Sequence, residues 1–261
     1  MLLPDLRFRL LGIVEIRRSE SWYGITPTKS RQVLSLLLCA PGQVVLVDRI
    51  IAALWGEDLP QTPSGLVRNY IMRLRRVLDG ESRIVTRSGG YQLDVDPGTV
   101  DVVRFERCLH RARHTEDPGE AERVLQEALS YWRGPALADA RQSPALELEA
   151  GRLEDLQVSG KQLAAELMIA RASFSEVASD LQPLVAVHPH RLRLWELMMV
   201  ALAHEGRSAE ALDAYSRCRI YHRTEYGLDL GERMSDLQQA VLRGQIDHWE
   251  IFARQTTGPR V

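Results

Sequence analysis

Apolar and polar residues alternate with a period of two at the start of the chain. The alternation runs over Leu6–Leu10 and again over Ile13–Ile16. A period of two places successive side chains on opposite faces of a strand. With breaks near Gly12 and at Ser19–Ser21, these residues predict short strands in an antiparallel meander.

The apolar spacing then changes to that of helices, and three helices are predicted. The first begins at Thr26-Pro27-Thr28, where a hydroxyl can cap the helix and proline suits the first turn, and it ends at Pro41-Gly42. The second is short, with Asp48 as its cap and Gly56 at its end. The third spans about 63–78.

A hairpin follows the third helix. Its β-forming residues flank the turn Ser88-Gly89-Gly90 within Arg83–Leu93. Three short helices followed by a terminal hairpin is the element order of a winged helix-turn-helix. In that fold the third helix enters the major groove, and the hairpin touches the backbone or the neighbouring minor groove.

The third predicted helix has two unlike faces when it is wound at 100° per residue. One arc is apolar and can be buried; it holds Val67, Tyr70, Ile71, Leu74, Val77 and Leu78. The other arc is mainly cationic and holds Arg68, Asn69, Met72, Arg73, Arg75 and Arg76.

The charge of the whole chain conceals this local patch. The 261 residues have a formal net charge of −2, yet residues 1–100 hold 13 Lys and Arg against 10 Asp and Glu. Six arginines and two acids lie between Thr62 and Leu93. A basic patch on an otherwise acidic chain indicates a local anionic partner.

The stretch WGEDLPQTPSGLVRNYIMRLRRVLD…IVTRSGGYQLDVD resembles the DNA-binding domain of OmpR/PhoB-type regulators. The resemblance is carried by Trp55-Gly56, the Ile-x-Arg-Leu-Arg-x-x-Leu block at Ile71–Leu78, and Arg87-x-Gly-Gly-Tyr. In those regulators the domain usually stands behind a phosphoacceptor domain, whereas here we expect it at the N-terminus. This order is typical of the Streptomyces antibiotic regulatory protein (SARP) family.

The resemblance to that family continues through the rest of the chain. It includes Val100–Glu106, Ala128–Leu137, His188-Pro189 and Gly206–Leu212. It implies a bacterial transcriptional activator domain that contacts a neighbouring copy and RNA polymerase holoenzyme, including its sigma factor. It also implies control of antibiotic or other secondary-metabolite genes.

Arginine suits nucleic acid because its planar guanidinium group can donate two hydrogen bonds at once, either to two acceptors on the edge of guanine or to two phosphate oxygens. Matching the motif position by position, we expect Arg68, Asn69 and Arg73 to contact base edges. Arg75 and Arg76 lie toward the far end of the helix, where we expect phosphate contacts.

Three further residues complete the predicted DNA-binding set. We expect Arg87, in the predicted hairpin that forms the wing of this fold, to contact the DNA backbone or the minor groove. Lys29 and Arg31 stand at the start of the first helix, whose N-terminal dipole would help them to bind phosphate.

The second half of the chain reads as helical throughout and contains a repeat. A 34-residue offset pairs Ala165 with Met199, Met168 with Leu202, Val177 with Ala211, Leu181 with Tyr215, and Leu184 with Cys218. This period is typical of tetratricopeptide repeats, which stack into a layer with a concave binding surface.

No motif predicts catalysis, a cofactor or a metal site. A phosphate-binding glycine loop, G-x-S-x-G and HExxH are absent, and no His/Cys cluster has ligand spacing. Cys39, Cys108 and Cys218 lie far apart, so we expect buried free thiols in a reducing cytoplasm. No apolar run reaches membrane-spanning length, so we expect no contact with a membrane.

The predicted fold is mixed and mainly α, with three parts. They are an OmpR/PhoB-type winged-helix domain at 1–96, a tetratricopeptide-like helical domain at 101–252, and a flexible tail at 253–261. We expect a transcriptional activator that binds promoter direct repeats as side-by-side copies and recruits polymerase. The alternatives are a tetratricopeptide adaptor whose winged domain binds no DNA, and a regulator controlled by a small ligand.

Overall fold

The computed structural model describes residues 5–78 and 83–246, and the predicted tail at 253–261 lies outside them. Packing divides the chain into an N-terminal unit, Met1–Gly160, and a C-terminal unit, Lys161–Val261. The boundary falls inside the long helix α6 (Pro144–Ala170).

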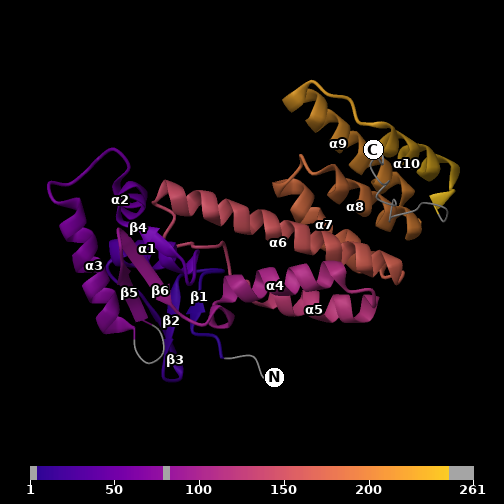
Figure 1. Ribbon diagram of the computed structural model, residues 1–261. Coiled ribbons are helices and arrows are strands. Elements are labelled where there is room, and N and C mark those ends of the chain that lie inside the picture. The colour runs from indigo at the N-terminus through magenta and orange to yellow at the C-terminus, as the bar shows by residue number, and fades with distance from the viewer. Residues whose placement is uncertain (1–4, 79–82, 247–261) are drawn as a thin grey trace, which may run out of the picture. The chain divides into compact units, whose positions relative to one another are not determined.

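A three-stranded antiparallel sheet begins the N-terminal unit, which confirms the predicted meander (Figure 1). Its strands are β1 (Phe8–Arg9), β2 (Glu15–Arg18) and β3 (Ser21–Gly24). The guanidinium carbon of Arg9 lies 3.6 Å from the centroid of the Trp22 ring, so a cation–π contact joins β1 to β3 across the sheet.

The three predicted helices are present, and the third begins at Pro63 as predicted, but the caps predicted for the first two are not observed. They are α1 (Thr28–Leu38), α2 (Val47–Trp55) and α3 (Pro63–Val77). No side chain caps α1, whose N-cap is Pro27, and Asp48 lies in the first turn of α2, whose N-cap is Leu46. Gly56 ends α2 as predicted, with a φ of +57° that favours glycine.

A second sheet, of strand order β4-β6-β5, packs beside these helices (Figure 1). It contains the predicted hairpin, β5 (Arg83–Arg87) and β6 (Gly90–Asp94), and a strand that the sequence did not indicate, β4 (Val44–Leu46). A Cβ at Gly90 would lie 2.4 Å from the carbonyl oxygen of Val45. Glycine is therefore required where β6 passes β4.

Helices α4 (Asp101–His114) and α5 (Pro118–Ser130) pack against each other and follow the hairpin within the same unit. They are joined to the second sheet by a single 3₁₀ turn, η1 (Pro97–Thr99). After α5 an irregular loop covers 131–143 and leads into α6.

A buried carboxylate joins the winged helix to α4. Asp101 is 1% exposed, and its oxygens accept hydrogen bonds from the backbone amides of Leu10, Leu11 and Val102 at 2.8–3.0 Å. Burial raises the pKa of Asp101 to about 6, against the opposing effect of the amide donors. The segment between β1 and β2 is thereby held on the first turn of α4.

The loop after α5 holds the same segment from the other side. The amides of Arg133, Leu137 and Ala138 donate to the carbonyls of 10–12 at 2.8–3.0 Å. Asp139 accepts from the amide of Val14 at 2.9 Å. These bonds explain why packing places the winged helix in one unit with α4 and α5. The predicted division at 1–96 and 101–252 stays a prediction about functional domains.

The C-terminal unit consists of helical hairpins (Figure 1). After the end of α6 come α7 (Phe174–Val187), α8 (Leu192–His204), α9 (Ser208–Tyr226) and α10 (Glu232–Arg243). The 34-residue offset superimposes the end of α6 on α8, and α7 on α9. Val177 and its partner Ala211 are both fully buried, and Leu181 and its partner Tyr215 are 1% and 6% exposed, so at these two pairs the repeat marks equivalent core positions.

Replacing Asp101 by Ala should lower the free energy of unfolding by about 3 kcal/mol, because buried amides lose their acceptor. Asp117 offers a matched comparison, since its exposed carboxylate also accepts from two amides, those of Gly119 and Glu120. Asp117→Ala should cost about 1 kcal/mol. Urea unfolding followed by circular dichroism measures both, and equal losses would contradict the role given to Asp101.

Candidate DNA-binding surface

Helix α3 is attached to the N-terminal unit by its apolar face, as predicted. Val67, Ile71 and Leu74 are at most 1% exposed, and α3 packs against α1 and α2. Tyr70 is half-buried, with its ring 6.4 Å from that of Trp55 at the end of α2. The other side of α3 is therefore left facing outward.

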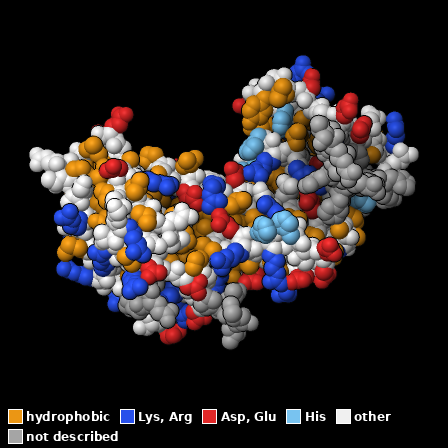
Figure 2. Space-filling model, viewed as in Figure 1, with side chains coloured by type: hydrophobic (Ala, Val, Ile, Leu, Met, Phe, Trp, Pro, Cys, Tyr) orange, Lys and Arg blue, Asp and Glu red, His pale blue; other side chains and the backbone are white. Residues whose placement is uncertain are grey.

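The outward side carries the predicted cations. We use the term α3 surface for its four exposed residues that make no hydrogen bond or ion pair with any other part of the described chain: Arg68, Asn69, Arg73 and Arg76. Figure 2 shows Lys and Arg side chains gathered along the edge of the molecule where α3 and β5 lie. Met72, 46% exposed, lies among them.

Arg75 has a different environment from its neighbour Arg76. Its Nε donates to the carbonyl of Ile84 at 2.9 Å, and its Nη2 donates to the hydroxyl of Thr86 at 2.8 Å. Both acceptors belong to β5. Arg75 therefore ties the third helix to the wing, and two of its guanidinium nitrogens are used within the domain rather than left for a phosphate.

The wing ends in a two-residue turn, Ser88-Gly89, in which Gly89 has a φ of +74°. The exposed Arg87 precedes this turn and donates from Nε to Gln92 on β6 at 2.6 Å. Gln92 in turn donates to the carbonyl of Gly42 at 2.6 Å. Arg87 is thus oriented by the hairpin while its outer nitrogens stay accessible.

The two basic residues at the start of α1 are engaged in the fold. Lys29 is half-buried, donates to the carbonyl of Leu54 and lies 5.8 Å from the Trp55 ring centroid; its burial lowers its pKa.

Arg31 pairs with Asp139 at 3.2 Å and also donates to the carbonyl of Ile25 at 2.8 Å. This geometry does not support the expectation that Lys29 and Arg31 bind phosphate, because the charged groups of both side chains are already held within the unit.

One cation escaped the sequence analysis. Arg49, in the first turn of α2, is exposed and has no ion pair or hydrogen bond within 5–78 and 83–246. The sequence gives no sign of a basic patch at Arg49, because its charge is cancelled locally by the adjacent Asp48. Thr86 was also missed, since only the folded hairpin brings it to Arg75.

Other site chemistries are not prominent in the described residues. Across 5–78 and 83–246, no three His, Cys, Asp or Glu side chains gather as a metal site would require. The described cysteines are free; Cys218 is buried, while Cys39 and Cys108 are half-buried. No helix in those ranges combines the length and apolarity needed to cross a membrane.

Two family models match the chain. Transcriptional regulatory protein, C terminal, matches residues 25–93, and Bacterial transcriptional activator domain matches residues 100–242, more than half of the chain. Regulatory protein DnrI of Streptomyces peucetius is 33% identical over 84% of this chain and 86% of its own length. The chain belongs to the SARP family. As a SARP it is a transcriptional regulator with a DNA-binding domain, and the relatives that it matches are regulators rather than enzymes.

Longer SARP relatives match as well. Regulatory protein AfsR of Streptomyces griseus is 33% identical over 97% of this chain, which spans only 26% of AfsR. A solved structure of Mycobacterium tuberculosis EmbR in complex with a low-affinity phosphopeptide has a TM-score of 0.83 and 30% identity. That match covers 92% of this chain and 66% of the EmbR chain, so it extends through the winged helix and the helical hairpins.

Adjacent arginines on α3 allow the role of Arg75 to be tested. Arg75→Ala should lower the free energy of unfolding by about 1 to 2 kcal/mol, because two hydrogen bonds to β5 are lost. Arg76→Ala should change it by less than about 0.5 kcal/mol. Thermal and urea unfolding of the two variants would measure this, and equal stabilities would remove Arg75 from its bridging role.

Proposed function

We propose that this regulator activates transcription by binding direct repeats in promoter DNA as side-by-side copies. Each copy lays α3 in a major groove and sets the wing against the neighbouring backbone or minor groove. The helical part then recruits RNA polymerase holoenzyme, including its sigma factor. The regulated genes are those of a pathway for an antibiotic or another secondary metabolite.

The observation that carries this proposal is the α3 surface. Its three arginines lie on one exposed side of a helix whose opposite side is buried, without a carboxylate partner in the described chain. Like charges gathered in this way repel one another and bind a polyanion with release of its counterions. Duplex DNA offers phosphates and base edges at the spacing of a helix in a groove.

Arg68, Asn69 and Arg73 are the proposed base contacts. Arginine can donate two hydrogen bonds to O6 and N7 of guanine, and asparagine can pair with N6 and N7 of adenine. Arg76, nearer the end of α3, is the proposed phosphate contact, and Arg87 is the proposed wing contact. Arg75 supports both elements from behind by fixing β5 against α3.

Arg73→Ala should weaken binding to the promoter repeat about 10- to 100-fold and relax preference at one base position, because a base contact is lost. Binding to random DNA should change by less than about threefold. Arg76→Ala should weaken binding to both kinds of DNA alike, because phosphates carry no sequence information. Fluorescence anisotropy with the two duplexes measures all four affinities.

The salt dependence provides the control for these assignments. Log K should fall linearly with log[salt], and each phosphate contacted should add about −0.9 to the slope. Arg76→Ala should reduce the magnitude of this slope by about 1. Equal losses on promoter and random DNA for Arg73→Ala would defeat its assignment to a base. A chain that binds neither duplex would support the adaptor alternative.

Recruitment from side-by-side copies depends on the helical phase of the repeats. Transcription by the purified host holoenzyme should rise when the full chain is added to a template with both repeats. Inserting about 5 bp between repeats and promoter should abolish the increase, and about 10 bp should restore much of it. If transcription rises equally with either insertion, polymerase is not contacted by the copies bound at the repeats.

A further inference from the structure

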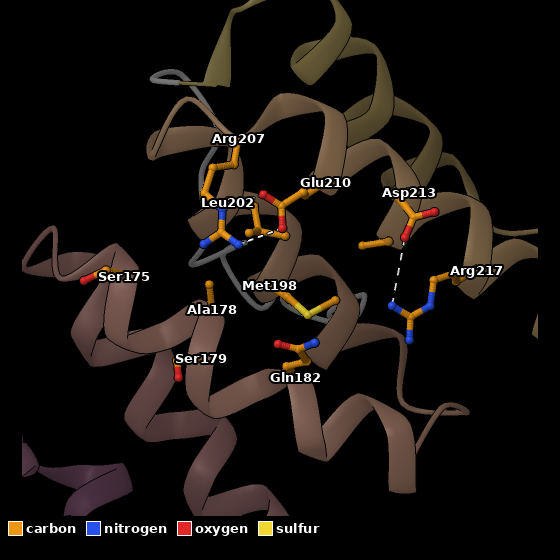
Figure 3. A pocket seen from close by; sticks show the side chains of 11 residues that line it. Ser175, Ala178, Ser179, Gln182, Met198, Leu202, Arg207, Glu210, Asp213 and Arg217 are labelled. Carbon is orange, nitrogen blue, oxygen red and sulfur yellow. Dashed lines mark hydrogen bonds and ion pairs between the residues drawn. The ribbon is translucent and has the colours of Figure 1, made fainter.

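The C-terminal unit contains a groove that DNA binding does not use. A cavity of about 290 Å³ lies between α7 and α9, over α8 (Figure 3). Its floor is apolar and formed by Ala178, Met198, Leu202 and Ala214, each at most 6% exposed. A cavity of this size accommodates a small molecule.

The α7 wall of the groove carries neutral hydrogen-bonding groups. Ser175, Ser179 and Gln182 are spaced i, i+4 and i+7, so they form one row along the helix. All three are exposed, and none has a hydrogen-bond partner in the described parts of the chain. This wall therefore offers unused donors and acceptors without net charge.

The α9 wall contains two ion pairs of different quality (Figure 3). Arg207 donates two hydrogen bonds to the carboxylate of Glu210, at 2.8 and 2.7 Å, and a third to Glu205 at 3.1 Å. Asp213 and Arg217 approach only to 4.0 Å and share no hydrogen bond. The second pair thus keeps a free carboxylate and free guanidinium donors next to each other.

The charges of the lining select a class of ligand. Arg207, Glu210, Asp213 and Arg217 sum to zero, and the opposite wall is neutral. A net anion placed at Arg217 would also meet Asp213, and a net cation placed at Asp213 would meet Arg217. A zwitterion avoids both repulsions, because its carboxylate can face Arg217 while its ammonium faces Asp213.

We propose that this groove is an effector site for a free α-amino acid with an aliphatic side chain. Arg217 binds the carboxylate, Asp213 and Gln182 bind the ammonium, and the side chain covers Met198 and Leu202. The guanidinium of Arg217 is supported from behind by the Trp195 ring, whose centroid lies 5.5 Å from its Cζ. The site is independent of the DNA-binding proposal, since none of its residues belongs to the N-terminal unit.

L-Leucine is the probe, titrated into the full chain by calorimetry up to about 10 mM, a range suited to so small a ligand in an open groove. Saturable binding at one site per chain is expected. L-Leucinamide lacks the carboxylate, and N-acetyl-L-leucine lacks the ammonium; each should bind at least about tenfold more weakly. N-acetyl-L-leucine binding as well as leucine would overturn the proposal in favour of a peptide carboxyl terminus.

Three variants test the placement. Arg217→Gln and Asp213→Asn should each weaken leucine binding about tenfold, and Ser179→Phe should block the groove from an exposed rim position. Arg223→Gln is the matched control, because Arg223 forms an exposed 2.8 Å pair with Asp229 further along the chain and does not line the groove. It should bind leucine as the native chain does.

The methyl group of Met198 supplies a readout that does not depend on mutation. In a methionine-methyl NMR spectrum its resonance should shift on addition of leucine, while that of Met234, on α10 and outside the lining, should stay in place. Absence of saturable heat at about 10 mM, a control variant that loses binding equally, or an unmoved Met198 resonance would each overturn the proposal.

Discussion

The carboxylate of Asp101 is the point on which the N-terminal unit depends. It is buried, and it satisfies amides on both sides of the junction between the winged helix and α4. A buried amide without an acceptor is costly, so Leu10 and Leu11 can leave α4 only if both of their amides lose the Asp101 acceptor. The first activator helices consequently accompany the DNA-binding domain as part of one body, rather than hanging from it on a linker.

On this body the elements that we propose to contact DNA are held in place by hydrogen bonds within the domain. Arg75 bonds α3 to β5, Gly90 lets β6 pass close to β4, and Gln92 connects Arg87 to Gly42. Side chains and loops that are already ordered lose less entropy on binding. The α3 surface combines this rigidity with three arginines that have no carboxylate partner among the described residues, which is the arrangement that the proposed groove-reading role requires.

The C-terminal unit shows the same contrast between satisfied and unsatisfied polar groups. The buried Glu196 is paired with both Arg193 and Arg233, and Arg207 is closed on Glu205 and Glu210. Asp213, Arg217 and the row of neutral groups on α7 are left open beside an apolar floor. A regulator built from a DNA-reading body and such a groove has the parts needed to join gene control to the level of a metabolite.

Local periodicity by itself determined much of this protein. The division of α3 into an apolar and a cationic face, the glycine turn of the wing and the 34-residue repeat are all set by residues close in sequence, and the structure confirms them. Motifs of the same kind also led to the family, which the relatives confirm.

Partners distant in sequence were decided only by the tertiary structure. Arg75 and Arg76 look alike in the chain, yet only Arg75 meets β5. Arg31 looks accessible at a helix start, yet it is bound to Asp139, 108 residues away. A side chain's periodicity is a property of its neighbours along the chain, whereas its hydrogen-bond partner depends on how separate elements close on one another. That is why the cationic face was predictable, while the set of arginines that have no internal partner among the described residues was not.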